Sequence, residues 1–169
     1  MSGPGTHSHD VVIVRGNQAD VIGRGFPATV RLLADSSATG GLLSTVRVTL
    51  AEGADGARPH HHASSSELFY VLGGAVEILS GDQVVTAHEG DLIIVPPKQA
   101  HAFAAAPGQP ADLLVIIAPG VERFGYFRQL EQIGKGELPA ESLLAVQDLY
   151  DTFFLDSAAW RDARSSTSR

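Results

Sequence analysis

Short apolar or alternating segments fill the chain from residue 10 to residue 118, and turn-forming residues separate them, among them Gly73-Gly74 and Gly81-Asp82. Val46, Val48 and Leu50 alternate with Arg47 and Thr49, which places the apolar side chains on one face of an extended strand. On this basis we expect strands at residues 11–15, 29–33, 42–50, 67–72, 75–80, 91–96 and 112–119. A spacing of roughly 8–12 residues, with no helix between the strands, predicts an all-β antiparallel sandwich or barrel over residues 11–118.

The pattern changes after Pro119 and Gly120. Apolar residues then recur every three or four positions from residue 122 to 133 and from 140 to 154, which predicts two helices. One face of the second would carry Leu143, Val146, Leu149, Tyr150, Phe153 and Phe154. Residues 119–163 are therefore expected to form a C-terminal α-helical appendage. Residues 1–10 are expected to be a flexible N-terminus, and residues 164–169 a disordered tail.

Composition narrows the class of protein. The chain has 169 residues, 44% hydrophobic and 18% charged, as in a soluble globular domain. A net charge of −7 without a basic patch argues against binding to nucleic acid or to a membrane surface. With no cysteine, disulfides and thiolate metal sites are excluded. The N-terminus lacks the apolar core of a secretory signal, so we expect a cytoplasmic protein.

Three consecutive histidines supply the first candidate chemistry. Residues two apart on a strand point the same way, so His60 and His62 can reach one metal ion while His61 faces the opposite side. Pro59 supports the strand, because it favours an extended conformation at Arg58 and is excluded from helix interiors. His61 is then either a residue at the rim of the site or a sheet-face residue.

Two further residues complete a candidate ligand set. Glu67 follows an Ala-Ser-Ser-Ser turn, and if this turn is a hairpin, Glu67 returns beside His62. His101 follows a Gly-Asp turn, an apolar strand and a Pro-Pro turn, which places it on a strand of the same sheet. Taken alone, Glu67 is equally well read as a solvent-facing glutamate, and His101 as a core histidine.

The spacing of these residues resembles the first motif of the cupin superfamily, a group of small jelly-roll barrels. That motif is Gly, five residues, His-x-His, three or four residues, Glu, six residues, Gly. His60, His62, Glu67 and Gly74 occupy its later positions, and Ala54 stands at the position of the leading glycine.

The second cupin motif is Gly, five residues, Pro-x-Gly, two residues, His, three residues, Asn. Gly90, Pro96 and His101 match it, whereas Lys98 replaces the second glycine and Ala105 replaces the asparagine. The resemblance implies a cupin jelly-roll β-barrel in which His60, His62, Glu67 and His101 bind one metal ion.

Three imidazoles and a carboxylate suit one divalent transition metal, Fe, Ni, Mn, Cu or Zn, and do not choose among them. An octahedral ion held by four side chains keeps two positions for a substrate or O2. We expect Val48, Phe69, Val71 and Phe103 to line a substrate pocket for an apolar or aromatic small molecule. Glu67 is also a candidate catalytic residue that takes a substrate proton.

A second resemblance covers residues 119–130 and the helix that follows, which look like the tail of bacterial quercetin-dioxygenase-like single-domain cupins. Four aromatic residues there either line the pocket entrance or pack the helices: Phe124, Tyr126, Phe127 and Tyr150.

Three functions stay open. The first is a dioxygenase acting on an aromatic or enolic small molecule. The second is a Lewis-acid isomerase or polyketide-type cyclase, and the third is a non-catalytic, metal-dependent small-molecule-binding protein. Because small cupins commonly pair their sheets, we expect a homodimer.

Overall fold

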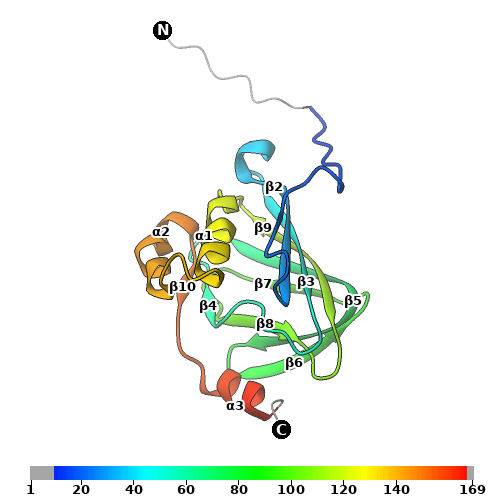
Figure 1. Cartoon of the computed structure of the whole chain (residues 1–169), viewed down its shortest axis with the longest axis vertical. Helices are drawn as coiled ribbons and strands as arrows, with labels where there is room; N and C mark the ends of the chain where they lie inside the picture. The colour runs from blue at the N-terminus through cyan, green and yellow to red at the C-terminus, as the bar shows by residue number, and fades with distance from the viewer. Residues whose placement is uncertain (1–9, 167–169) are drawn as a thin grey trace.

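The computed structural model describes residues 10–166, and β-strands make up most of the ordered chain (Figure 1). They run in the order β1-β2-β3-β9-β5-β8-β4-β10, with β6 and β7 also paired to β5. Their bounds are β1 (Val21–Ile22), β2 (Ala28–Ala34), β3 (Ser44–Leu50), β4 (His60–His61), β5 (Ser66–Ser80), β6 (Gln83–His88), β7 (Leu92–Val95), β8 (His101–Ala105), β9 (Ala111–Ala118) and β10 (Phe153–Phe154).

All pairings are antiparallel, as the turn-rich sequence predicts. The alternation at residues 46–50 is confirmed, because Val46, Val48 and Leu50 are buried. They belong to one apolar core between the sheet faces, together with Leu32, Phe69, Val71, Val76, Ile78, Phe103, Leu113 and Val115. This arrangement is a jelly roll.

The long strand β5 belongs to both halves of the fold. Its first part pairs with β7 and β9, and its second part pairs with β6 and β8. The register shifts between Val71 and Gly73, where we expected a turn between two strands. Gly74 has φ +70, and a Cβ there would lie 1.9 Å from the carbonyl oxygen of Pro110. The glycine pair therefore makes a bend within one strand, which a sequence pattern does not distinguish from a turn.

Two other strand predictions were wrong. Residues 11–15 form no strand, and Val11 is 85% exposed, because none of the described strands pairs with this segment. Conversely, β6 was missed, although the expected turn at Gly81 and Asp82 leads into it. Most residues of β6 are exposed, so the strand lacks the apolar alternation that marks the other strands.

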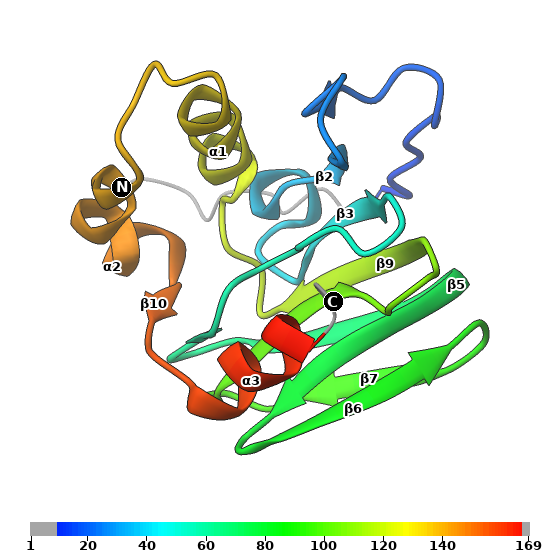
Figure 2. The same cartoon turned by 60° about the horizontal axis from the view of Figure 1, so that its bottom comes forward.

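The strand path is open among the described residues, with β1 at one end and β10 at the other. The C-terminal segment as far as β10 lies at the left of the strands in Figure 1, whereas its last helix lies below them, and Figure 2 shows the same separation. Helix α1 (Phe124–Gly134) confirms the first predicted helix. Its N-terminus is held by Asp35, whose Oδ1 and Oδ2 accept hydrogen bonds from the backbone N–H groups of Arg123 (2.7 Å) and Phe124 (3.0 Å).

The second predicted helix is broken. Residues 140–154 form a 3-10 helix, η2 (Ala140–Val146), a short α2 (Gln147–Tyr150) and then β10. Asp151 ends α2 in the left-handed conformation, at φ +48. Phe153 and Phe154 therefore pair with His61 and His60 of β4 rather than extending a helical face.

The last element of the described residues is α3 (Ala158–Ser166), so residues 164–166 are helical and not the start of a disordered tail. Arg164 anchors this helix by ion pairs to Asp55 (3.1 Å) and Glu77 (2.9 Å).

A second 3-10 helix, η1 (Ser36–Thr39), links β2 to β3. The predictions of a flexible N-terminus and of a disordered tail fall, for residues 1–9 and 167–169, outside the described residues. Within residues 10–166, none of the helices is long and apolar enough to cross a membrane.

Candidate metal centre

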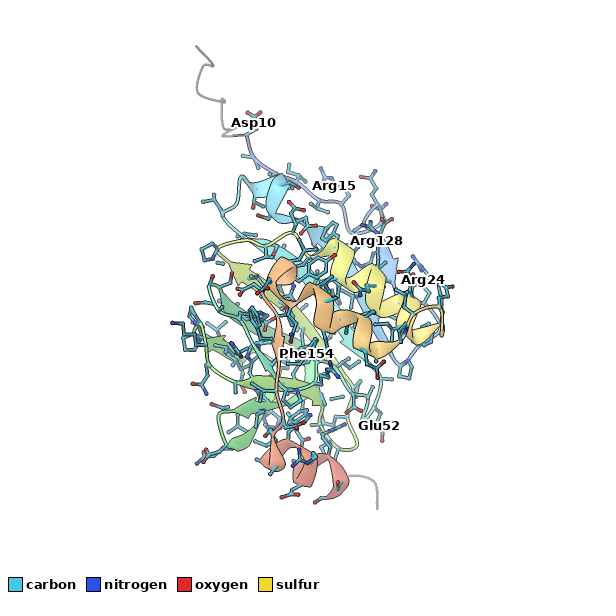
Figure 3. All side chains as sticks on the ribbon, turned by 90° about the vertical axis from the view of Figure 1, so that its left-hand side faces the viewer. Asp10, Arg15, Arg24, Glu52, Arg128 and Phe154 are labelled. Atoms are coloured by element: carbon cyan, nitrogen blue, oxygen red, sulfur yellow. The ribbon has the colours of Figure 1, made fainter. Side chains whose placement is uncertain are left out.

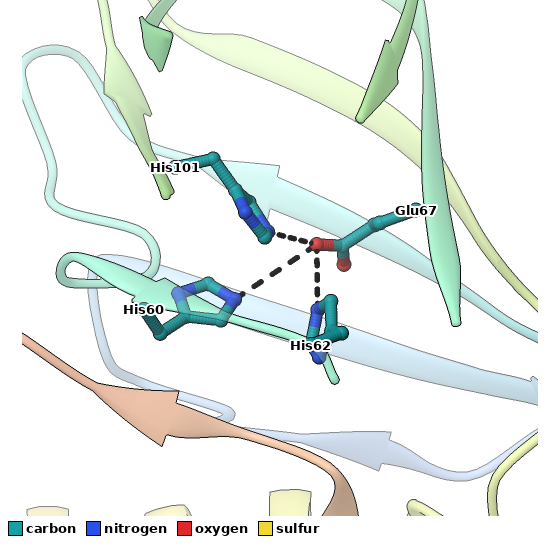
Figure 4. A group of neighbouring side chains, drawn as sticks. All are labelled: His60, His62, Glu67 and His101. Carbon is teal, nitrogen blue, oxygen red and sulfur yellow. Dashed lines mark hydrogen bonds and ion pairs between the residues drawn. The ribbon is translucent and has the colours of Figure 1, made fainter. Parts of the chain in front are cut away.

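Two neighbouring strands and a connecting segment bring the three candidate histidines together (Figure 4). His60 lies in β4 and pairs directly with His101, the first residue of β8. His62 follows β4 at once, and its ring is buried on the same side as that of His60. Glu67 approaches from β5. The predicted strand geometry thus holds for His60, His62 and His101.

Glu67 reaches the histidines by a different route from the hairpin that we considered. Its strand pairs Glu67 with Val95 of β7 and Ile117 of β9, not with β4. The segment between His62 and Ser66 therefore crosses from one part of the sheet to the other. The carboxylate faces the imidazoles across the barrel interior.

The four side chains converge on one point. Glu67 Oε2 lies 2.6 Å from Nε2 of His101, 3.1 Å from Nε2 of His62 and 3.9 Å from Nε2 of His60. One ligand atom from each residue lies within 4.8 Å of the other three, and all four residues are buried. The structure thus gathers the complete predicted set in a geometry able to hold one metal ion.

Backbone carbonyls orient all three rings. Nδ1 of His60 lies 2.8 Å from the carbonyl oxygen of Arg58, Nδ1 of His62 lies 2.5 Å from that of Asp151, and Nδ1 of His101 lies 2.9 Å from that of Gln99. A carbonyl only accepts hydrogen bonds, so each Nδ1 carries the proton. In a neutral ring, Nε2 then presents its lone pair to the centre of the cluster.

Electrostatics make this centre a site for a cation. Burial is the largest influence on the pKa of His60 and lowers it well below its ordinary value, so this ring is neutral. Burial alone would raise the pKa of Glu67, but His101 and His62 outweigh it and hold this pKa well below its ordinary range. Converging lone pairs and an ionised carboxylate repel one another unless protons or a metal ion lie between them. Nitrogen and carboxylate donors of this kind suit a divalent transition metal.

His61 faces away from this centre, as the strand prediction requires. Its ring stacks on Phe153 of β10, with centroids 5.3 Å apart and an interplanar angle of 21°. It is therefore a packing residue on the opposite face of β4.

Asp151 holds the crossing segment and was not predicted from the sequence. Besides its carbonyl contact with His62, its carboxylate accepts backbone hydrogen bonds from Ala63 (2.7 Å), Ser64 (3.1 Å) and Ser65 (3.2 Å). These bonds fix the segment that joins His62 to Glu67. Local pattern gives no signal for this role, because the partners are separated by 86 to 89 positions.

A cavity of about 440 Å³ adjoins the metal centre, and His60 and Glu67 form part of its wall. Val48 and Phe103 line it, as expected, whereas Phe69 and Val71 do not. Both are fully buried in the core, where the ring of Phe69 packs edge-on against Phe103 at 5.2 Å. Both residues share a strand face with Glu67 but pack in the core instead of lining this cavity, and which residues contact a substrate stays a prediction.

The C-terminal segment supplies the opposite wall. Tyr126, Phe127, Leu130 and Ile133 of α1 line the cavity, and so does Phe154 of β10. Phe124 and Tyr150, which we also considered at the entrance, line a separate surface hollow instead. Two arginines that the sequence analysis did not single out, Arg58 and Arg123, complete the cavity lining.

The family model of the cupin domain matches residues 46–117, which contain all four candidate ligands. Residues 46–117 thus form a cupin domain. No curated relative matches the sequence significantly. Asp151 and α1 lie beyond the residues that the cupin model matches.

Solved cupin-like structures agree with this fold. An RmlC-like cupin from Shewanella frigidimarina is 21% identical, with a TM-score of 0.56, over 68% of this chain and 96% of that chain. The polyketide cyclase RemF from Streptomyces resistomycificus is 18% identical, with a TM-score of 0.54, over 65% and 80%. Pac13, a nucleoside dehydratase from Streptomyces, is 16% identical, with a TM-score of 0.53, over 65% and 83%. At these identities the similarity extends to the fold alone.

Proposed function

We propose that this cupin is a metal-dependent dioxygenase that acts on an aromatic or enolic small molecule, with His60, His62, Glu67 and His101 as the metal ligands. The observation that carries the proposal is the junction of the ligand cluster with the cavity. His60 and Glu67 belong to both, so a molecule in the cavity is in contact with the metal centre.

A divalent transition metal bound there would supply Lewis acidity and, where it is redox-active, a route for electrons from the substrate to O2. The chain supplies the surroundings. Val48, Phe103 and Phe127 provide apolar walls that suit a ring-shaped substrate and exclude water. Glu67 is the proposed acceptor of a substrate hydroxyl proton. Both oxygen atoms of O2 enter the product, and the substrate supplies the electrons, so no external reductant is required.

The position of α1 supports the resemblance to quercetin-dioxygenase-like cupins. In that resemblance the C-terminal helices border the mouth of the barrel, and here Tyr126 and Phe127 of α1 lie on the cavity wall. This wall would hold the substrate against the metal centre.

The test is anaerobic loading of the purified protein with Fe(II), Ni(II), Mn(II) or Cu(II), followed by O2 uptake with flavonols and other enols. We expect uptake with at least one metal, and incorporation of both atoms of ¹⁸O2 into the product. The metal-loaded His88→Ala variant is a matched control, because His88 is exposed on β6. Absence of uptake with every metal across a broad panel would contradict the proposal.

One observation favours a second function, Lewis-acid isomerisation or cyclisation without O2. Burial raises the pKa of Tyr126 above its ordinary value, against the smaller effect of Arg123 and Arg58. Its hydroxyl makes no hydrogen bond to any other described residue, so it is a neutral phenol on the cavity wall, able to donate a proton. The similar folds include a polyketide cyclase and a nucleoside dehydratase, neither of them named as a dioxygenase, and this supports the second function.

Anaerobic turnover by the zinc-loaded protein would distinguish this second function from the first. Tyr126→Phe should then lower kcat by roughly 10²-fold or more, because a general acid contributes on that scale. A dioxygenase should lose little kcat in the same variant. Ligand binding without turnover under either condition would instead identify a non-catalytic, metal-dependent binding protein.

The homodimer stays a prediction. The outer face of β5 and β7 offers an apolar surface for it, with Tyr70, Leu72, Leu92 and Ile94 all exposed. Sedimentation of the wild type and of Ile94→Lys tests it: a dimer that pairs through this face should dissociate in the variant.

A further inference from the structure

Arg123 occupies an unusual position for a charged residue. It directly precedes α1, its backbone is fixed by Asp35, and the residue is only 7% exposed. Its side chain lines the same cavity as His60 and Glu67. A positive charge thus lies inside the apolar pocket beside the metal centre.

The guanidinium of Arg123 has no carboxylate partner within the part of the chain that the structure describes. Among residues 10–166, no side chain forms an ion pair with the guanidinium, and none of its N–H groups has a hydrogen-bond acceptor. Its contacts are the rings of Tyr126 and Phe127, whose centroids lie 5.1 and 5.7 Å from the guanidinium carbon. Buried charges are normally paired, because an unpaired ion loses its hydration without compensation.

A water molecule would satisfy only part of the guanidinium. A cavity of about 20 Å³ behind Glu67 is lined by Arg123 and Ser44, whose Nε and Oγ both lack partners. This volume accommodates roughly one water molecule. Arginine has five N–H donors in a planar fork, so donors remain for the larger cavity.

Arg58 adds a second positive charge at the cavity wall. It is exposed, and its guanidinium carbon lies 3.8 Å from the centroid of the Phe154 ring. The two acidic residues on the wall are already engaged: Glu67 in the metal centre, and Glu131 with Lys135 and the backbone of Gly23. A divalent ion beside Glu67 would make the cavity more positive still.

We propose that Arg123 is the anchor of an anion-binding subsite, with Arg58 at its mouth, and that the natural substrate carries a carboxylate in addition to the oxygens that reach the metal. The proposal rests on the proposed enzymatic function and specifies its substrate. A planar carboxylate matches the guanidinium fork. Its single charge balances the one buried arginine, whereas a phosphate ester would bring a second charge into an otherwise apolar cavity.

The experiment measures binding rather than activity. The protein is loaded with Zn(II), which is redox-inert, and titrated calorimetrically with 3,4-dihydroxybenzoate and with its neutral, isosteric match, 3,4-dihydroxybenzamide. We expect the wild type to bind the acid roughly 10- to 100-fold more tightly, as one charge-assisted pair provides. Arg123→Met should remove this preference, and Arg123→Lys should retain part of it.

Arg128→Met is the matched control, because Arg128 lies on the helix that Arg123 precedes but points to the surface (Figure 3), where it pairs with Asp20. It should keep the full preference. Bound zinc and the thermal unfolding midpoint are measured for each variant, so that a folding defect is separated from loss of the subsite. If Arg123→Met fails to fold, the comparison of Arg123→Lys with Arg128→Met still decides the question.

Three results would overturn the proposal. The first is equal binding of the acid and the amide by the wild type. The second is a preference for the acid that persists in Arg123→Met, which would assign the carboxylate to the metal. The third is tighter binding of phenyl phosphate than of benzoate by the wild type. The outcome is independent of the O2 assays. A carboxylate preference without O2 uptake removes the dioxygenase and keeps the subsite, and O2 uptake without the preference does the reverse.

Discussion

The cupin strands and the C-terminal segment contribute different parts of the candidate site. The four candidate ligands lie between residues 60 and 101, within the strands that the cupin model matches. Asp151, Arg123 and Tyr126 all come after residue 118, where the match has ended. The region that the model matches thus supplies the candidate ligands, whereas the later segment contacts His62 through Asp151 and shapes the cavity beside the cluster.

This division has a physical basis. Ligand convergence needs rigid neighbours, and β4 and β8 provide them through the direct pairing of His60 with His101. The cavity wall needs only an apolar helix at the open side of the sheet. The residues of this helix are therefore freer to differ between proteins that share the same barrel fold. We therefore expect changes in the strands to affect metal binding and changes in α1 to affect substrate binding.

The largest effect is expected for His101→Ala. Removing a ligand from the centre of the cluster should lower metal affinity by more than about 100-fold, beyond the loss typical of an outer contact. Competition with a chromophoric chelator measures it. His88→Ala, an exposed histidine on β6, should bind metal as the wild type does. An equal loss of metal affinity in both variants would show that the metal does not bind at the cluster.

Asp151→Asn tests whether the C-terminal segment acts on the metal centre. Asparagine tolerates the left-handed backbone at this position, but its amide group cannot accept hydrogen bonds at both ends of the side chain. The segment joining His62 to Glu67 should loosen, and metal affinity should fall by roughly 10-fold. Asp148→Asn, on the exposed side of α2, is the control. Unchanged metal affinity in Asp151→Asn would show that metal binding depends on the strands and not on Asp151.

Removing the metal from the wild-type protein should test the same link between Asp151 and the metal centre. A ligand at 100 times its dissociation constant stabilises the native state by about 2.7 kcal/mol, which corresponds to roughly 5–11 °C in the unfolding midpoint for a domain of this size. Hydrogen exchange should then accelerate at residues 62–67 and at 147–152 together. Faster exchange in the first segment alone would indicate that Asp151 does not transmit the loss.

Arg164→Met should have the smallest effect on the site, although it too lies in the C-terminal segment. It removes the ion pairs to Asp55 and Glu77, and Glu77 is mostly buried, so we expect a loss of about 1–2 kcal/mol in the free energy of unfolding. Metal affinity should not change, because α3 packs against β6, which carries none of the four candidate ligands. Denaturant unfolding and chelator competition measure the two quantities. A fall in metal affinity would extend the coupling to the whole segment.

Much of the fold was visible in the sequence because it depends on local periodicity. The alternation in β3, the helical repeat of α1 and the turn at Gly81 and Asp82 each depend on neighbouring residues, and each prediction holds. The failures arise where a local pattern has two physical solutions. Gly73 and Gly74 permit either a turn or a bend within a strand, and apolar residues 11–14 form a strand only where another strand is available to pair.

The sequence by itself determined that His60 and His62 share a face, because spacing along a strand decides this, and the resemblance to the cupin motifs added Glu67 and His101 as candidate ligands. Tertiary structure alone decided what surrounds them. Asp35 holds the start of α1, Asp151 holds the segment before Glu67, and Arg123 enters the cavity, each across more than 80 positions of chain or between separate elements. Such contacts depend on how the chain returns on itself in three dimensions, and periodicity carries no information about that path.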